Sequence, residues 1–219
     1  MQEFFVKRKI QKYEVKREAN ADNPEFLEEL AGLYQKLSQR DKAIECYQCT
    51  IEAYYREDSR LGVDNEFILG ICWHLLELDP LNLLAHQTLG QEFCGLGEFE
   101  EAVHVYKSFA VKLARAGRYE DAIAQYRHAF VLVSDDIKGR QQCFSLLWKL
   151  RRKEEAVQEL RKIADIAERK GAIAKAAECY QKALKIYPSN PELRAALRRL
   201  VQVHRRENNQ LRLVVNNDV

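Results

Sequence analysis

The chain has 219 residues, of which 47% are hydrophobic and 31% are charged, with nine Gly and four Pro. This composition is typical of a helical globular protein and excludes an intrinsically disordered chain. No run of about 18 apolar residues occurs, so we expect no transmembrane helix, and the amino terminus lacks the apolar segment of a secretory signal. Six Cys are too few for a disulfide scaffold, so we expect reduced thiols and a cytoplasmic protein.

The net charge of +2 conceals a charge polarity along the chain. Residues 20–101 contain five basic and seventeen acidic residues, whereas residues 102–219 contain twenty-four basic and thirteen acidic residues. A chain with an acidic middle and a basic far half has a large electric dipole, which can orient partners or copies of itself. The alternative is that solvent-exposed faces simply differ in sign.

The apolar periodicity predicts helices nearly throughout and no strands. The first helix, residues 2–19, is basic. After a break, Asn23 supplies an N-cap and Pro24 the first helical position of the next helix. Gly97, Gly117 and Gly171 stand between helices, where glycine can adopt the left-handed conformation that ends a helix. The further helices are expected at residues 24–37, 41–56, 64–78, 83–94, 98–115, 118–133, 138–150, 153–169, 173–186 and 191–206.

Four alanines show an internal repeat, because they are spaced 20, 34 and 20 residues apart along the chain. They are Ala102, Ala122, Ala156 and Ala176. Each alanine is followed four positions later by a large side chain. A shift of about 54 residues superimposes the second pair on the first, together with further positions such as Gly117 on Gly171. Units of this kind bury their apolar faces only by stacking, so the pattern predicts a helical solenoid with a long binding surface.

Three sets of small and aromatic residues resemble the tetratricopeptide repeat, a helix–turn–helix unit of about 34 residues. The resemblance covers residues 24–206 and implies an all-α fold, a right-handed α-solenoid of about 11 antiparallel helices. In the family, the small residues let the two helices of a unit approach closely. The three sets are Ala31, Tyr34, Ala43 and Tyr47; Gly90, Phe93, Gly97, Ala102 and Tyr106; and Ala164, Ala167, Ala176, Tyr180, Ala183 and Pro188.

The array departs from the family's regular spacing of about 34 residues between equivalent alanines. The 20-residue spacings make one helix both the second helix of one unit and the first helix of the next. We therefore expect three-helix units of about 54 residues. The expected organisation is an amino-terminal basic amphipathic helix at 1–20, a repeat domain at 21–206 and a flexible tail at 207–219. The repeat domain comprises triplets at 24–79, 83–135 and 137–189 and a capping helix at 191–206.

Motifs for catalysis are missing from the sequence, so we expect no enzyme, no cofactor and no metal site. Cys46 and Cys49 have the spacing of half a zinc site, but no second pair of ligands follows, and Cys46 aligns with Cys179 in the repeat. The five His form no metal-binding pair, and neither a phosphate loop nor a Gly-x-Ser-x-Gly motif occurs. Cys72, Cys94 and Cys143 are expected to be buried, and Trp73 is expected to lie in the core.

The resemblance implies that partner peptides bind along the groove lined by the first helix of each unit. Chaperone-binding members grip a carboxylate with Lys and Asn, and the matching residues here, Glu28, Gly32, Thr88, His104 and Ser108, do not fit that pattern. Trp148 is the chief candidate, because Trp is enriched at binding hot spots; the alternative is a buried packing role. The candidate partner-binding residues are Gln87, Gln91, Lys107, Lys138, Gln141, Gln142, Ser145, Trp148, Arg161 and Lys162.

The leading hypothesis is a non-enzymatic adaptor or scaffold that binds a partner protein or peptide. One alternative is RNA binding by the basic carboxy-terminal half, although no repeated base-reading code occurs. Another is self-assembly of the acidic middle against the basic end. For residues 1–17, the hypotheses are a cap on the stack, a docking helix and peripheral contact with an anionic membrane surface.

Overall fold

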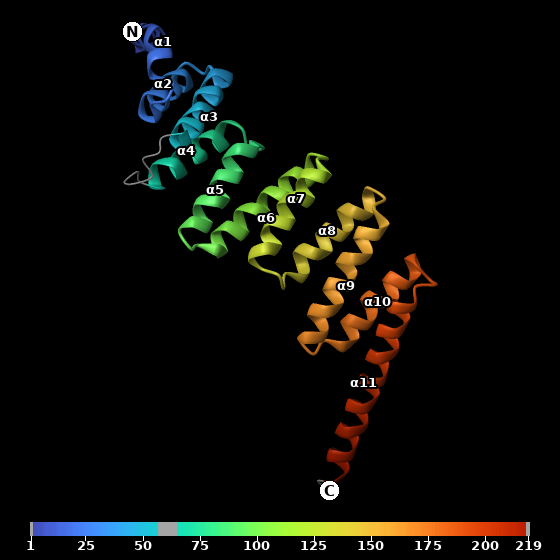
Figure 1. Ribbon diagram of the computed structural model, residues 1–219. Helices are drawn as coiled ribbons and strands as arrows, with labels where there is room; N and C mark the ends of the chain where they lie inside the picture. The colour runs from blue at the N-terminus through green and yellow to red at the C-terminus, as the bar shows by residue number, and fades with distance from the viewer. Residues whose placement is uncertain (1, 57–64, 218–219) are drawn as a thin grey trace. The chain divides into compact units, whose positions relative to one another are not determined.

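The computed structural model describes residues 2–56 and 65–217, and within these ranges it contains eleven α-helices, one short 3-10 helix and no strand (Figure 1). The all-α prediction is confirmed. The α-helices are α1 (Gln2–Lys16), α2 (Pro24–Lys36), α3 (Arg40–Arg56), α4 (Asn65–Leu78), α5 (Leu83–Gly95), α6 (Phe99–Arg115), α7 (Tyr119–Leu132), α8 (Ile137–Lys149), α9 (Lys153–Arg169), α10 (Ile173–Ile186) and α11 (Pro191–Asn217).

The chain divides into two compact units, Met1–Phe109 and Ala110–Val219, with the division inside α6. We call them unit 1 and unit 2. In each unit, helices that follow one another in the sequence pack side by side as antiparallel neighbours (Figure 1). The break predicted between α3 and α4 lies outside the described residues.

Side-chain caps fix several helix starts. Asn23 Oδ1 accepts a hydrogen bond from the backbone N–H of Phe26 (2.8 Å), and Pro24 occupies the first helical position, as predicted. Asn82, Asp136 and Asn190 accept equivalent bonds at the starts of α5, α8 and α11. Each cap satisfies a backbone donor that the helix itself leaves unpaired, which defines where these helices begin.

Left-handed residues end five of the helices described. Gly97, Gly117 and Gly171 have φ angles of 78°, 79° and 71°, as the sequence predicted. Ser38 and Arg151 adopt the same conformation with φ angles of 57° and 59°, although neither is glycine. Arg151 occupies the position that the internal repeat matches to Gly97, so the turn is repeated even where the glycine is not.

The core of unit 1 lies between α2, α3, α4 and α5. Ala31 of α2 and Ala43 of α3 are completely buried, which allows the two helices to approach closely, and Tyr34 and Tyr47 fill the space beside them. Helix α1 packs against α2 through buried Ile10 and through Tyr13, whose ring stacks on Phe26 at 4.7 Å.

The core of unit 2 repeats this arrangement between α9 and α10. Ala164 and Ala176 are completely buried at the contact between the two helices, and Leu160 and Tyr180 pack beside them. Leu193 and Leu200 of α11 join the same cluster. Small residues where backbones meet and large ones beside them are therefore common to both units.

Three expectations about the helices were wrong. Trp73 is 51% exposed, because Ile68, Cys72 and Leu75 form the buried stripe of α4 and Trp73 lies off that stripe. The last helix does not end at Arg206 but continues to Asn217. Residues 207–217 contain no Pro or Gly to interrupt it. The first helix also ends early, at Lys16, and a 3-10 turn follows at Glu18–Asn20.

Candidate protein-interaction surface

Ion pairs join α7, α9 and α11 of unit 2 into one layer. Arg127 of α7 pairs with Glu155 of α9 at 2.6 Å. Arg161 of α9 pairs with Glu192 of α11, and Arg199 of α11 pairs with Glu168 of α9 at 2.7 Å. The helices α7, α9 and α11 are every second helix along the chain. Because the ion pairs connect α9 to both of the others, α9 lies between α7 and α11.

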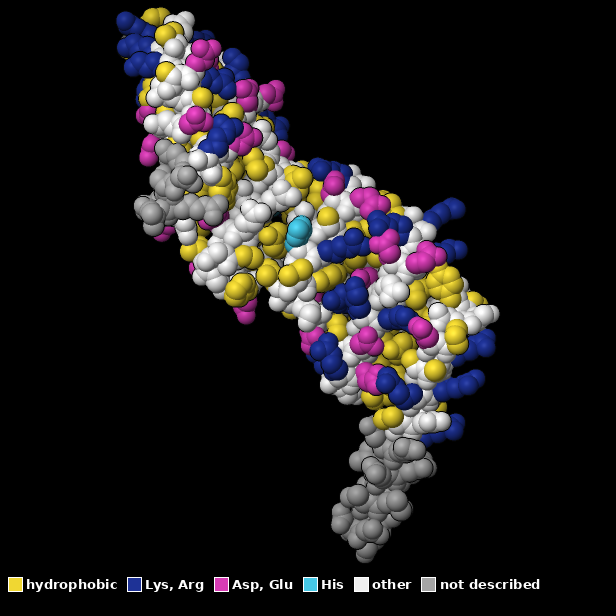
Figure 2. Space-filling view, in the orientation of Figure 1, with side chains coloured by type: hydrophobic (Ala, Val, Ile, Leu, Met, Phe, Trp, Pro, Cys, Tyr) yellow, Lys and Arg dark blue, Asp and Glu magenta, His cyan; other side chains and the backbone are white. Residues whose placement is uncertain are grey.

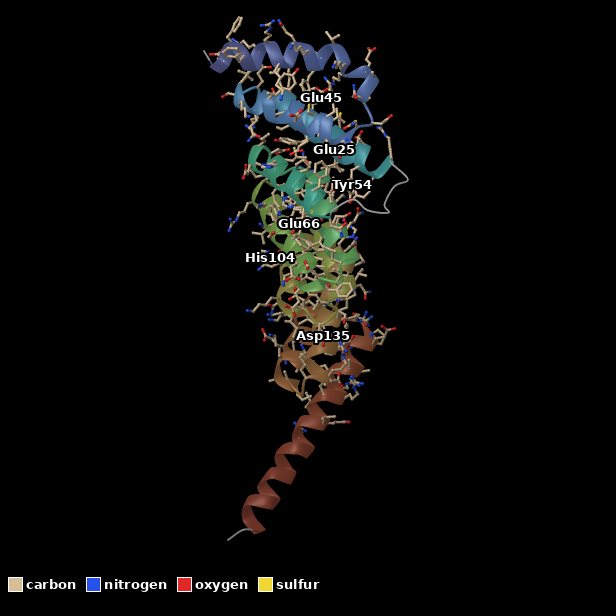
Figure 3. All side chains as sticks on the ribbon, turned by 90° about the vertical axis from the view of Figure 1, so that its left-hand side faces the viewer. Glu25, Glu45, Tyr54, Glu66, His104 and Asp135 are labelled. Carbon is tan, nitrogen blue, oxygen red and sulfur yellow. The ribbon has the colours of Figure 1, made fainter. Side chains whose placement is uncertain are left out.

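Two further groups of charges extend this layer at the helix ends. Asp135, in the turn after α7 (Figure 3), pairs with Arg169 at 2.8 Å and with Lys170 at 3.6 Å. Arg152 pairs with Glu120 and Glu155, and its hydrogen bond lowers the pKa of the Glu155 carboxyl. On this layer, arginines that reach a neighbouring helix are therefore matched by carboxylates.

Helices α8 and α10 lie on the other side of α9. Both pack directly against α9, and Phe144 of α8 contacts the cluster that contains Leu160 and Tyr180. Because α9 is antiparallel to each of them, α8 and α10 run in the same direction. We call the solvent-exposed residues of these two helices together the α8–α10 face.

The residues of this face follow helical spacing. On α8, the exposed positions lie three or four residues apart, opposite buried Cys143 and Leu147. On α10 the same spacing places charged residues opposite buried Ala176 and Ala183. The face comprises Lys138, Gln141, Gln142, Ser145, Trp148 and Lys149 of α8 and Lys175, Glu178, Gln181, Lys182 and Lys185 of α10.

Trp148 is the principal apolar group of the face. Its side chain is 47% exposed, so it does not have the buried packing role. The indole stacks on the half-buried ring of Phe144, with centroids 6.3 Å apart and planes inclined by 21°. Beside it, Lys149 Nζ lies 5.1 Å from the ring centroid of Tyr119. A stacked, half-exposed indole presents apolar area without needing to be ordered on binding.

The charges of the face are unequal. The face contains five lysines and a single carboxylate, that of Glu178, which pairs with Lys182 at 2.7 Å. Their hydrogen bond lowers the pKa of Glu178 and raises that of Lys182, so both stay ionised near neutral pH. Unit 2 as a whole contains twenty-three basic and thirteen acidic residues, and Lys and Arg side chains project from its margin in Figure 2.

A buried ion pair anchors α8 beneath this face. Arg140 Nη1 donates to Glu159 Oε2 at 2.9 Å, and the two side chains are only 9% and 7% exposed. The guanidinium also donates to the carbonyl oxygen of Ser134 from Nε (3.2 Å) and Nη2 (3.0 Å), and it lies 4.3 Å from the ring centroid of Phe130. This network fixes α8 on α9 and therefore fixes the direction in which Trp148 projects.

The predicted partner-binding residues fall into three groups. Five of them, Lys138, Gln141, Gln142, Ser145 and Trp148, lie together on α8. Arg161 and Lys162 lie on α9, where they pair with Glu192 and Glu159. Gln87, Gln91 and Lys107 lie on α5 and α6 of unit 1.

Sequence reasoning missed the lysines of α10 and the buried pair. Lys175, Lys182 and Lys185 recur at helical spacing, a signal present in the sequence. The burial of Arg140 could be inferred from its place between apolar-facing positions of α8, but its partner Glu159 lies on a different helix.

The positions matched to a carboxylate clamp are also unsuited to one in the structure. Thr88 is 2% exposed and faces the core. The Ser108 hydroxyl donates to the carbonyl oxygen of Val105 at 3.0 Å. His104 is exposed on α6 (Figure 3). Because a terminal carboxylate needs converging cationic or amide donors, this set does not form a grip for it.

Cys72 and Cys143 are buried as expected, whereas Cys94 is only partly buried, so the expectation for Cys94 was wrong. Cys46 is 1% exposed, and burial raises the pKa of its thiol to about 11, which keeps it protonated near neutral pH. A protonated thiol is neither a nucleophile nor a metal ligand. In the part of the chain that the structure describes, no three His, Cys, Asp or Glu side chains are grouped as metal ligands would be. None of the helices described has the length and apolarity needed to span a bilayer.

Comparison with known proteins identifies a tetratricopeptide repeat at residues 157–190, which contain α10 and most of α9. A search of curated protein sequences gives no match. Among solved structures, MamA is 18% identical over 74% of this chain and 89% of its own, with a TM-score of 0.36. BtubC from P. vanneervenii is 15% identical over 94% and 91%, with a TM-score of 0.38. YrrB, described as a TPR protein with an unusual peptide-binding site, is 17% identical over 85% and 96%, with a TM-score of 0.28.

Proposed function

The chain is an all-α helical-repeat protein with a tetratricopeptide repeat at residues 157–190, and we propose that it is a cytoplasmic, non-enzymatic adaptor that binds a partner protein. Proteins with this repeat are generally non-catalytic scaffolds that bind proteins or peptides. The proposed binding site is the α8–α10 face, within the repeat domain that we place at residues 21–206.

The exposure of the Trp148 side chain is the observation that carries this proposal. An indole that is 47% exposed and supported by Phe144 is a large apolar group that folding leaves half in water. Hot spots of protein interfaces are enriched in Trp, and they typically lie among polar residues that exclude water around them. Gln141, Gln142 and Ser145 supply such a polar surround on α8.

Affinity purification with wild-type chain and two Trp variants tests the proposal. Trp148→Ala removes the proposed anchor, whereas Trp73→Ala removes a Trp of similar exposure, 51%, from α4 of unit 1. We expect a protein partner that wild type and Trp73→Ala retain and that Trp148→Ala binds about 30-fold more weakly, the loss typical of a hot spot.

Two results would contradict the proposal in different ways. Equal retention by all three proteins would show that the partner does not use the α8–α10 face. Recovery of no specific protein partner by any of them would argue against an adaptor.

A further inference from the structure

We propose that the α8–α10 face binds an acidic polypeptide segment of the partner, with one apolar side chain of that segment against Trp148. The inference rests on the proposed adaptor function and adds the chemistry of the partner. It also extends the site from the predicted residues of α8 to Lys175, Lys182 and Lys185 of α10.

The α8–α10 face is positively charged. Lys138, Lys175 and Lys185 are exposed, and among the described residues none has a carboxylate within ion-pair distance. On the opposite layer, by contrast, arginines reach carboxylates on neighbouring helices, such as Arg127 to Glu155 and Arg199 to Glu168. Clustered cations without counter-charges create a positive potential that attracts an anionic partner and accelerates its association.

The polar groups between the lysines suit a peptide backbone. The side-chain amides of Gln141, Gln142 and Gln181 each both donate and accept hydrogen bonds. This matches the N–H and C=O groups of a peptide backbone, whereas phosphate oxygens only accept. The cations of the face are all lysines, and none is the forked arginine that binds phosphates in a bidentate manner.

The aromatic content of the face suits a polypeptide rather than a single-stranded nucleic acid. Proteins that bind single strands stack successive bases on several aromatic rings. The exposed residues of α8 and α10 include one aromatic ring, that of Trp148. One ring suits one apolar side chain in an otherwise acidic segment.

The geometry also indicates the arrangement of that segment. Because α8 and α10 run in the same direction, Trp148 and Lys149 lie at the same end of the face as Lys185, and Lys138 lies at the same end as Lys175. Lys138 and Trp148 on α8 are ten residues apart, as are Lys175 and Lys185 on α10, which corresponds to about 15 Å along each helix axis. About five residues of extended peptide span this length. The expected ligand places an apolar residue on Trp148, near one end of the face. Acidic residues precede and follow it, so that they meet the lysines at both ends of the face.

Fluorescence anisotropy with three labelled probes tests the inference. The first probe is a ten-residue peptide of Glu and Asp with one Leu. The second replaces every Glu and Asp with Gln and Asn. The third is an oligo-dT of ten nucleotides. With the full chain, we expect saturable binding of the acidic peptide, at least tenfold weaker binding of the amide peptide, and weakening with added salt.

Two triple variants with equal charge change locate the site. Lys175→Glu/Lys182→Glu/Lys185→Glu reverses the α10 lysines and is expected to weaken acidic-peptide binding at least tenfold. Lys153→Glu/Arg198→Glu/Arg205→Glu reverses exposed residues of α9 and α11 and is expected to change it less than threefold. Thermal unfolding followed by circular dichroism verifies that both variants fold.

Four outcomes would overturn the inference. These are no binding of the acidic peptide, an equal loss in both triple variants, tighter binding of oligo-dT at low and physiological salt, and self-association that the α10 variant abolishes. The last would identify a second copy of this chain as the occupant. If the acidic peptide fails while a protein partner still depends on Trp148, the adaptor function stands and only the acidic chemistry is wrong.

Discussion

Gly90 of α5 lies directly against the ring of Tyr106 of α6, so closely that a methyl group on Gly90 would overlap the tyrosine ring. Tyr106 is 7% exposed and cannot swing freely into solvent. Completely buried Ala102 lies one helical turn before Tyr106 on α6. The tight approach of the two helices therefore depends on a missing side chain at residue 90.

Gly90→Ala is expected to destabilise the chain by about 2 kcal/mol, because an overpacked helix contact must shift to accommodate the methyl group. Urea unfolding followed by circular dichroism measures the change. Gly32→Ala is the matched control, since a Cβ there meets no atom within 4 Å, and alanine in a helix is favoured over glycine by about 0.5–1 kcal/mol. Equal destabilisation by both substitutions would show that the Tyr106 contact is not responsible.

The helix pairs could be predicted because their contacts are local and repeated. Ala102, Ala122, Ala156 and Ala176 are all completely buried, which their spacing indicated. The turn at Arg151 could not be recognised from its residue type, since a left-handed arginine has no sequence signal of its own. Only its place in the repeat, where it matches Gly97, indicates that the same turn occurs again.

Arg151→Gly tests whether this turn is strained. A left-handed conformation costs a residue with a Cβ about 1–2 kcal/mol, whereas glycine in the unfolded chain loses more entropy on folding, by about 0.5–1 kcal/mol. We therefore expect a net gain of about 0.5 kcal/mol in the free energy of unfolding. The reciprocal change, Gly97→Ala, introduces the strain and is expected to cost about 1 kcal/mol. Urea unfolding measures both, and a loss of stability in Arg151→Gly would contradict the prediction.

The interaction surface could be predicted in part. The α8 residues were identifiable because exposed polar positions recur at helical spacing around Trp148. Trp73 was misplaced because apolar composition dominates α4, and only the packing against α3 and α5 decides which of its apolar residues is left exposed. The Arg140–Glu159 pair was missed because it connects two helices, a relation that the pattern within one helix does not carry.

Removing one member of the Arg140–Glu159 pair is expected to be costly. Arg140→Met leaves the buried Glu159 carboxylate with only the exposed Lys162 ammonium, at 3.0 Å, as its charged partner, so the expected cost lies below the about 3–5 kcal/mol of a buried charge left without any partner. The double variant Arg140→Met/Glu159→Leu removes both charges and is expected to recover most of that loss. Thermal and urea unfolding measure these changes, with Glu178→Gln, in an exposed pair, expected to remain within about 0.5 kcal/mol of wild type. A double variant no more stable than Arg140→Met would show that the uncompensated charge is not the cause.

Stability is expected to fall at alkaline pH, in part because of Cys143. Burial, together with the negative charge of Glu159, raises the pKa of this thiol from its ordinary 9.0 to about 12. The folded-state pKa lies above the unfolded value, so the stabilisation is fully present below pH 9 and is lost as pH rises toward 12. At pH 10.5, ionisation in the unfolded chain alone lowers the free energy of unfolding by about 2 kcal/mol, since one pH unit corresponds to about 1.4 kcal/mol.

Urea unfolding of wild type and Cys143→Ala at pH 8 and pH 10.5 measures this contribution. We expect the wild type to lose about 2 kcal/mol more than the variant between the two pH values. Equal losses would show that the Cys143 thiol is not the group responsible.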